Sequence, residues 1–143
     1  MGHAQLLARY LKKHKKLVEP RQGWNSLHSS LHLAYSMGRK RGFTDLGTYV
    51  NKAGDHGWDD RRRMAAAFDL GRKDRFLFKG WGYIKARRLA QLYVKHHKAL
   101  NIEYVILGRR IWSRSWGRWH PLTTGDTSHD FHIHVSGSVA HDS

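Results

Sequence analysis

The sequence predicts one α+β domain in which N-terminal helices pack on a small, largely antiparallel sheet. Three observations lead to this class. Helical periodicity dominates the first 50 residues, residues 104–107 and 110–112 form two β-runs joined by a turn, and residues 130–136 alternate strictly between polar and apolar. A chain of 143 residues with 40% hydrophobic side chains can bury one core. We therefore expect a helical part over 1–50, a core over 51–136 and a loose tail over 137–143.

Three helices are expected before residue 51. Residues 4–18 have apolar side chains at helical spacing with lysines between them, and Pro20 should end that helix. A second helix is expected from Asn25 or Ser26 to Lys40, and Thr44 should cap a short helix through Val50. The other expected elements, in chain order, are a loop over 52–63, a short central strand over 64–69, a helix over 83–98, the hairpin 104–112, a long loop over 113–128 and the strand 130–136.

The last strand is the strongest sign of chemistry. Its even-numbered positions carry the Asp130 carboxylate and the imidazoles of His132 and His134, while its odd-numbered positions are large and apolar. Successive side chains of a strand point to opposite faces, so both imidazoles should share one polar face and could serve a metal ion. The alternative is a half-exposed strand that contains histidines by chance, because the chain has 12 of them.

A second candidate is Asp69, which follows the apolar run 64–68. A carboxylate at the end of a buried strand is costly unless it is paired, hydrogen-bonded or bound to a cation, so Asp69 either has a structural role or ligates a metal. Because the chain has no cysteine, any metal must be held by His, Asp or Glu.

The formal net charge of +15 favours anionic partners such as nucleic acid, lipid headgroups or cell-wall polymers. No apolar run approaches the roughly 20 residues of a membrane span, and the N-terminus lacks the apolar segment of a secretory signal. We therefore expect neither integral membrane association nor a signal peptide.

Several of these segments together resemble a known family. Asp55-His56, the step Ala67-Phe68-Asp69 and the run from His132 to Ser136 resemble the zinc peptidases of the D-Ala-D-Ala carboxypeptidase/L,D-endopeptidase type, which include many phage endolysins. The run 104–112 resembles the hairpin before the H-x-H strand of actinobacteriophage lysin peptidases. The resemblance covers roughly residues 50–136.

The resemblance implies that His56, Asp69 and His134 hold zinc and that His132 is the acid/base or electrostatic partner, with His120 and His129 as reserve ligands. The sequence departs from the family pattern S-x-H-x-x-G-x-A-x-D in the gap between His56 and Asp69, which is longer and requires a bulging loop, and in Arg63, which stands where a strict match has His. Asp130 also lies one residue earlier than the acid that often precedes H-x-H.

The function implied is that of an endolysin-like zinc metallopeptidase, which hydrolyses a stem-peptide or cross-bridge amide bond of peptidoglycan with a metal-bound water as nucleophile. Arg21 would assist the oxyanion, and Trp116, Trp119 and Trp58 could form walls of the cleft. Expected partners are peptidoglycan and anionic wall polymers. We expect a monomer that is made in the host cytoplasm and acts on the cell wall.

Two alternatives remain open at this point. The net charge and the interleaved Trp and Arg residues of 111–116 also fit a basic nucleic-acid-binding protein or a metal-dependent nuclease of phage origin, although no helix-turn-helix or zinc-finger signature is present. A metal-free wall-binding module is the third possibility, against which the combination of Asp69 and His134 argues.

Overall fold

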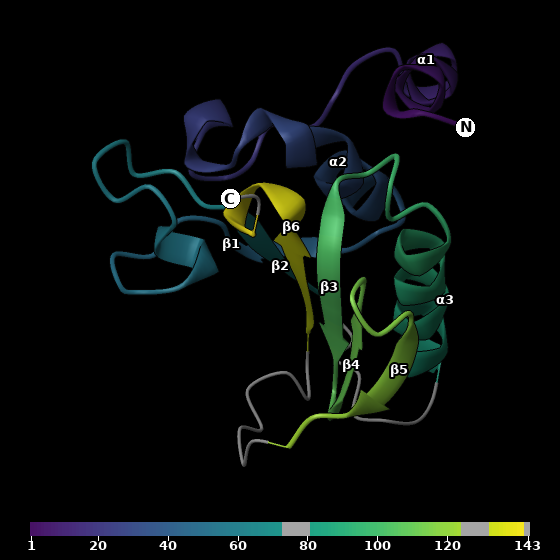
Figure 1. Cartoon of the computed structure of the whole chain (residues 1–143). Coiled ribbons are helices and arrows are strands. Elements are labelled where there is room, and N and C mark those ends of the chain that lie inside the picture. The colour runs from purple at the N-terminus through teal and green to yellow at the C-terminus, as the bar shows by residue number, and fades with distance from the viewer. Residues whose placement is uncertain (73–80, 124–131, 142–143) are drawn as a thin grey trace.

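The computed structural model describes residues 1–72, 81–123 and 132–141 (Figure 1). The helices are α1 (His3–His14), α2 (His32–Lys40) and α3 (Trp81–Lys95). The strands are β1 (Thr44–Gly47), β2 (Ala67–Gly71), β3 (Ile102–Leu107), β4 (Arg110–Ser113), β5 (Arg118–Pro121) and β6 (Ile133–Gly137). Short 3-10 helices cover Trp24–Ser26, Ser29–Leu31, Asp55–Gly57 (η3) and Ser138–Ala140 (η5).

The strands form a single six-stranded sheet in the order β1-β2-β6-β3-β4-β5. Every neighbouring pair is antiparallel, which confirms the predicted α+β class. The C-terminal strand β6 is inserted between β2 and β3, so the last segment of the chain lies at the centre of the sheet. The sequence marks the neighbouring interior strands β2 and β6 with Asp69 and His134.

One face of the sheet packs against the helices. Phe68 and Leu70 of β2 and Ile133 and Val135 of β6 are completely buried on this side. The ring of Phe68 makes edge-to-face contacts with Tyr35 of α2 (centroids 5.7 Å apart) and with Tyr93 of α3 (6.1 Å), so that it joins both helices to the sheet. This apolar layer is the core of the protein.

The other face carries the polar side chains. Asp69 pairs with His134 across β2 and β6, and His134 pairs with Ile106 across β6 and β3. Paired residues in an antiparallel sheet point to the same side, so these residues lie opposite the helical layer. The predicted polar face of the last strand is therefore confirmed for residues 132–136, whereas Asp130 and Phe131 lie outside the described residues.

The N-terminal helices are shorter than the periodicity predicts. Helix α1 ends at His14 rather than Val18, because Lys15 adopts a left-handed backbone (φ 73°) and turns the chain before Pro20. The second helix begins at His32 rather than at Asn25 or Ser26. Two 3-10 turns precede it, and between them Leu27 forms a parallel bridge with Ala65. Contact with another segment thus replaces the first turns of the expected helix.

The prediction of a helix from Thr44 to Val50 is wrong, because residues 44–47 form edge strand β1 against β2. The buried Asp45 carboxylate fixes this strand by accepting hydrogen bonds from the Tyr35 hydroxyl (2.7 Å), the Gly47 amide (2.8 Å) and the Arg21 amide (2.9 Å). Tyr35 and Arg21 are distant from Asp45 in the sequence, so the local pattern does not reveal them as donors.

Two further segments have more structure than expected. The long loop 113–128 contains β5, which extends the hairpin as a third strand paired with β4. The expected loose tail begins inside β6 at Gly137, continues as η5 and is described as far as His141. Strand β2 also continues past Asp69 to Gly71, so the carboxylate sits in the middle of a strand and not at its end. Within the described ranges, the helices are too short and too polar to cross a bilayer.

Substitution of Gly38 tests how tightly α2 packs on the sheet. A Cβ at this position would lie 2.3 Å from Leu70 Cδ1 and 2.5 Å from the Tyr93 hydroxyl, which is committed to the Ala34 carbonyl. We expect Gly38→Ala to lower the free energy of unfolding by about 1–3 kcal/mol, although alanine normally favours a helix. Urea denaturation measures the change. The control Gly2→Ala places a methyl group in open space and should have little effect, and a stabilised Gly38→Ala variant would contradict this packing.

Candidate metal centre

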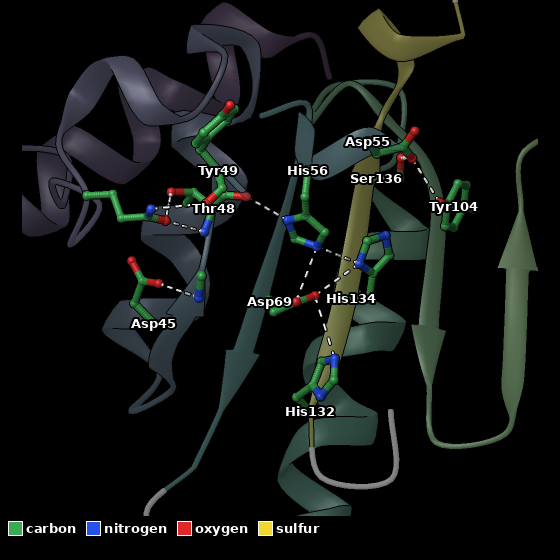
Figure 2. Close-up of polar contacts among 12 residues, drawn as sticks. Asp45, Thr48, Tyr49, Asp55, His56, Asp69, Tyr104, His132, His134 and Ser136 are labelled. Carbon is green, nitrogen blue, oxygen red and sulfur yellow. Dashed lines mark hydrogen bonds and ion pairs between the residues drawn. The ribbon is translucent and has the colours of Figure 1, made fainter. Parts of the chain in front are cut away.

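The centre of the polar face is the cross-strand pair Asp69 and His134 (Figure 2). Asp69 Oδ1 lies 2.9 Å from His134 Nδ1, and both side chains are largely enclosed, with exposed fractions of 22% and 8%. Their positions follow from strand register alone, since directly opposite residues have Cβ atoms about 5 Å apart. The sheet therefore presents one carboxylate and one imidazole as a fixed pair.

His56 approaches this pair from the loop between β1 and β2. It lies in η3, which is held by the hydrogen bonds from the Val50 amide to the His56 carbonyl (3.1 Å) and from the Ala66 amide to the Asp55 carbonyl (2.8 Å). Only glycine fits at position 57, because a Cβ there would lie 2.0 Å from the Lys52 carbonyl oxygen. The loop thus folds tightly back on itself to carry His56 over the sheet.

The orientation of the His56 ring is set by Thr48. Nδ1 of His56 lies 2.6 Å from the Thr48 carbonyl oxygen, and a carbonyl can only accept, so Nδ1 carries the hydrogen. This leaves Nε2 directed at the pair, 3.2 Å from Asp69 Oδ2 and 3.2 Å from His134 Nδ1. A histidine whose second nitrogen donates to a backbone carbonyl is the usual arrangement of a metal ligand.

The long interval between His56 and Asp69 does not separate them. Asp59 and Met64 form an isolated antiparallel bridge with both backbone hydrogen bonds at 3.0 Å, so residues 60–63 project as a small hairpin. Arg63 has a left-handed backbone (φ 55°) in this hairpin. The expected bulge is present, and it removes the additional residues from the path to the site.

Together, His56, Asp69 and His134 could hold a metal ion, because their ligand atoms all lie within 4.8 Å of one another. Two imidazole nitrogens and one carboxylate oxygen suit a borderline cation such as zinc, with further coordination positions left for other ligands. Three lone-pair donors that converge in a largely enclosed place repel one another unless a proton or a cation lies between them. The chemistry of the donor set therefore fits a bound cation.

Without a metal, protons take over part of this role. Burial alone would lower the pKa of His56, but the Asp69 carboxylate and the Thr48 carbonyl outweigh it and raise the pKa above its ordinary value. Burial alone would raise the pKa of Asp69, but hydrogen bonds and charge from His134 and His56 hold that pKa well below its usual range. The carboxylate is thus ionised at any ordinary pH and available to a cation.

His132 lies beside the three donors rather than among them. Its Nε2 is 3.7 Å from Asp69 Oδ1, and its side chain is 15% exposed. Figure 2 shows its ring on the opposite side of Asp69 from His56. The sequence-based prediction that His132 and His134 share one face is confirmed by this common contact with Asp69. A titratable group at this distance from a metal centre is placed to exchange protons with a molecule bound there.

A layer of polar contacts behind the donors was not predicted from sequence. The Asp55 carboxylate accepts hydrogen bonds from the Tyr104 hydroxyl (2.8 Å) and from Ser136, and the Tyr104 ring stacks on His134 with centroids 5.5 Å apart. Burial would raise the pKa of Asp55, but these donors lower it below its ordinary value. The sequence could have indicated Ser136, because it lies two residues after His134 and so on the same face of the strand. It could not have indicated Tyr104, whose contact with His134 depends on the pairing of β3 with β6.

The predicted substrate-binding residues are dispersed. Arg21 is exposed, and its backbone amide binds Asp45. Trp119 pairs with Trp112 on the helical face, where it lines a cavity of about 390 Å³ with residues of α3, so it forms no wall of the metal centre. Strand register places Trp119 on the face of the sheet away from the donors. The sequence could not show this, because residues 113–128 were expected to form a loop and a loop has no alternation between two faces.

Trp116 and His120 lie far from the metal centre. Trp116 is 59% exposed and stacks on the ring of His120, with centroids 3.9 Å apart. His120 belongs to edge strand β5 and does not join the donor group as the reserve ligand it was expected to be. The other reserve, His129, lies outside the described residues. Trp58 directly follows η3, and its ring contacts His28 edge-to-face, with centroids 5.4 Å apart.

Comparison of the chain with protein-family profiles, curated proteins and solved structures finds no match in any of the three.

Metal affinity should depend on pH in a defined direction. The raised pKa of His56 means that a metal must displace its proton at and above pH 6.5, the ordinary histidine value, whereas Asp69 adds no competing proton. We expect affinity to rise with pH by up to about one released proton per metal across the range from about pH 5 to about pH 8. Calorimetry in buffers of different ionisation enthalpy measures this, and a pH-independent affinity would contradict the assignment of His56.

The hairpin of residues 60–63 should be dispensable for the metal centre. Replacement of these four residues by Asn-Gly retains the Asp59–Met64 bridge in a tighter turn and removes the exposed contact between Tyr49 and Asp60. We expect metal affinity to stay within about threefold of the original, because a ligand or its support usually changes affinity by about 10-fold or more. Asp69→Asn is the comparison that should lose binding. Equal losses in both variants would show that the hairpin supports the site.

Proposed function

We propose that the chain is a zinc-dependent peptidoglycan peptidase that hydrolyses a stem-peptide or cross-bridge amide bond. The observation that carries the proposal is the convergence of His56, Asp69 and His134, with His132 adjacent to the carboxylate. These are the four residues that the family resemblance names. Their arrangement in the structure supports the same roles.

Zinc is the metal that this donor set suits best. His56 Nε2, His134 Nδ1 and one oxygen of Asp69 would hold it, and the all-oxygen shells that calcium and magnesium prefer are absent from the described group. When bound, zinc supplies an activated water at neutral pH and polarises the carbonyl of the scissile amide. Thr48 and Tyr104 orient the two imidazoles before any substrate arrives.

His132 supplies the remaining requirement, a group that can move a proton. Amide hydrolysis needs a proton delivered to the leaving nitrogen. His132 lies within reach of the donors but outside the group that holds the metal. Its Nε2 shares Asp69 Oδ1 with His134, so a positive charge on its ring is stabilised by the carboxylate without occupying the metal position. This arrangement supports the role of acid/base partner.

A metal-dependent nuclease or nucleic-acid-binding protein is the second candidate. The observation in its favour is the net charge of +15, which attracts any polyanion. A single His2Asp group would also serve phosphodiester hydrolysis, so the two candidates differ in substrate rather than in metal chemistry. The same preparation can test both.

The decisive experiment is to measure metal content and hydrolysis on one preparation. We expect about one zinc per chain and release of stem-peptide fragments with new amine and carboxyl termini from purified peptidoglycan, both abolished by chelator. Mass spectrometry of the fragments names the bond. Bound zinc without such fragments, together with cleavage of DNA or RNA, would favour the nuclease. If neither peptidoglycan nor nucleic acid is cleaved, both candidate functions are excluded.

His132→Ala separates proton transfer from metal binding. We expect this variant to keep its zinc and to lose about 100-fold to 10,000-fold in kcat, which is the usual contribution of a general acid or base. His134→Ala is the matched comparison on the same strand face and should lose zinc and activity together. Loss of zinc from the His132 variant would instead identify it as a ligand.

A further inference from the structure

The helical layer carries charge of one sign. No Asp or Glu occurs in α1, α2 or α3, whose charged side chains are Arg9, Lys12, Lys13, Arg39, Lys40, Lys85, Arg87, Arg88 and Lys95. The carboxylates of Asp55, Asp59 and Asp69 lie instead in the β1–β2 connection and on the open face of the sheet. The Asp69 carboxylate and the cations of the helices therefore lie on opposite sides of the sheet.

Two adjoining cavities concentrate this charge. The first, of about 400 Å³, is lined by α1, α2 and the end of α3 and includes Arg9, Lys13, Lys40 and Arg41. The second, of about 350 Å³, includes Arg41 again together with Lys85 and Arg88. Because Arg41 and Leu92 line both cavities, the two adjoin, and we call them together the cationic groove.

Among the residues that the structure describes, no carboxylate neutralises the charges of the cationic groove. Across the part of the chain that the structure describes, no carboxylate pairs with Arg9, Lys13 or Lys40. Lys85 and Arg88 lie over the ring of Trp81 at 5.5 Å and 5.7 Å, a contact that leaves their charge in place. Desolvation and the charges of Lys13, Lys40 and Arg41 lower the pKa of His14 in the same cavity. Unpaired cations held this close attract an external anion.

The side chains that line the groove favour an anion that carries several charges. The apolar floor includes Leu6 and Tyr10, which are only 6% and 7% exposed, so this part of the floor offers little surface to a bilayer. Beside the groove, Trp81 is 59% exposed, and Lys85 and Arg88 lie over its ring, so an anion that reaches the ring meets two cations. A flexible chain of phosphates can contact several of the lining cations at once and needs neither an apolar insertion nor a stacked base.

We propose that the cationic groove binds a linear polyol-phosphate polymer of the cell wall. The inference rests on the proposed function for the location of its ligand, but the groove and the metal centre occupy opposite sides of the sheet. A polymer bound along the helices leaves the metal centre open. The groove then keeps the protein on the wall while the metal face acts on peptide.

The test compares two variants of equal charge. Arg9→Gln/Lys13→Gln/Lys40→Gln neutralises the groove, and Lys52→Gln/Arg61→Gln/Arg118→Gln neutralises three exposed cations elsewhere. Affinity for lipid-free poly(glycerol phosphate) is measured by calorimetry at several salt concentrations. We expect the groove variant to lose at least about 10-fold in affinity and its salt dependence to fall by about 2 units of slope, whereas the control stays within about threefold. Equal losses in both variants would overturn the groove in favour of bulk charge.

Two further arms separate other ligands. A single-stranded oligonucleotide and vesicles of phosphatidylglycerol are titrated under the same conditions, and tighter groove-dependent binding of either would overturn the assignment to a wall polymer. If the triple variant does not fold, Lys85→Gln/Arg88→Gln tests the second cavity in the same way. Hydrolysis of a soluble stem peptide should be unchanged in the groove variant. Polymer binding without any hydrolysis would refute the proposed function and leave the groove standing.

Discussion

The contact between Asp69 and His134 is the constraint on which the rest of the structure depends. A carboxylate in the middle of a central strand is unfavourable unless another group compensates its charge, and His134 lies 2.9 Å from it on the neighbouring strand. The two strands hold this contact only in one register. A shift of β2 by one residue would turn Phe68 to the open face and direct the carboxylate into the core. Core packing and site geometry are therefore one requirement.

The third donor depends on a different kind of support. His56 belongs to no strand, so its position relies on the Thr48 carbonyl, on the backbone contacts of η3 and on the close approach that Gly57 allows. Because the acceptor is the main-chain carbonyl of Thr48, its position does not depend on a side-chain rotamer. Asp55 then links the same turn to Tyr104, whose ring stacks on His134. The loop and the sheet are thereby joined on both sides of the metal centre, which preorganises the donors.

The sheet also divides the protein electrostatically. Carboxylates on the open face neutralise the histidines and could neutralise a metal, while the helices behind the sheet carry lysine and arginine without acidic partners of their own. Charges on the two sides are separated by the apolar layer around Phe68 and Tyr93. Nine lysine and arginine side chains and no carboxylate occur in α1, α2 and α3, so the helical side of the sheet should attract a polyanion without involving the donor group.

The sequence by itself determined the fold class and three residues of the site, namely Asp69, His132 and His134. Alternation in residues 132–136 sets which side chains share a face, and the apolar run before Asp69 identifies a buried strand, because both are local consequences of strand geometry. His56 could be named from sequence only by resemblance, since nothing local shows that a loop folds back over the sheet. Tertiary structure decided the remainder. Contacts of the buried Asp45 made residues 44–47 a strand, and pairing of β5 with β4 placed Trp119 on the helical face. The Asp59–Met64 bridge brought His56 and Asp69 together despite the long interval between them. Each of these outcomes depends on a partner distant in sequence, and local periodicity contains no information about such partners.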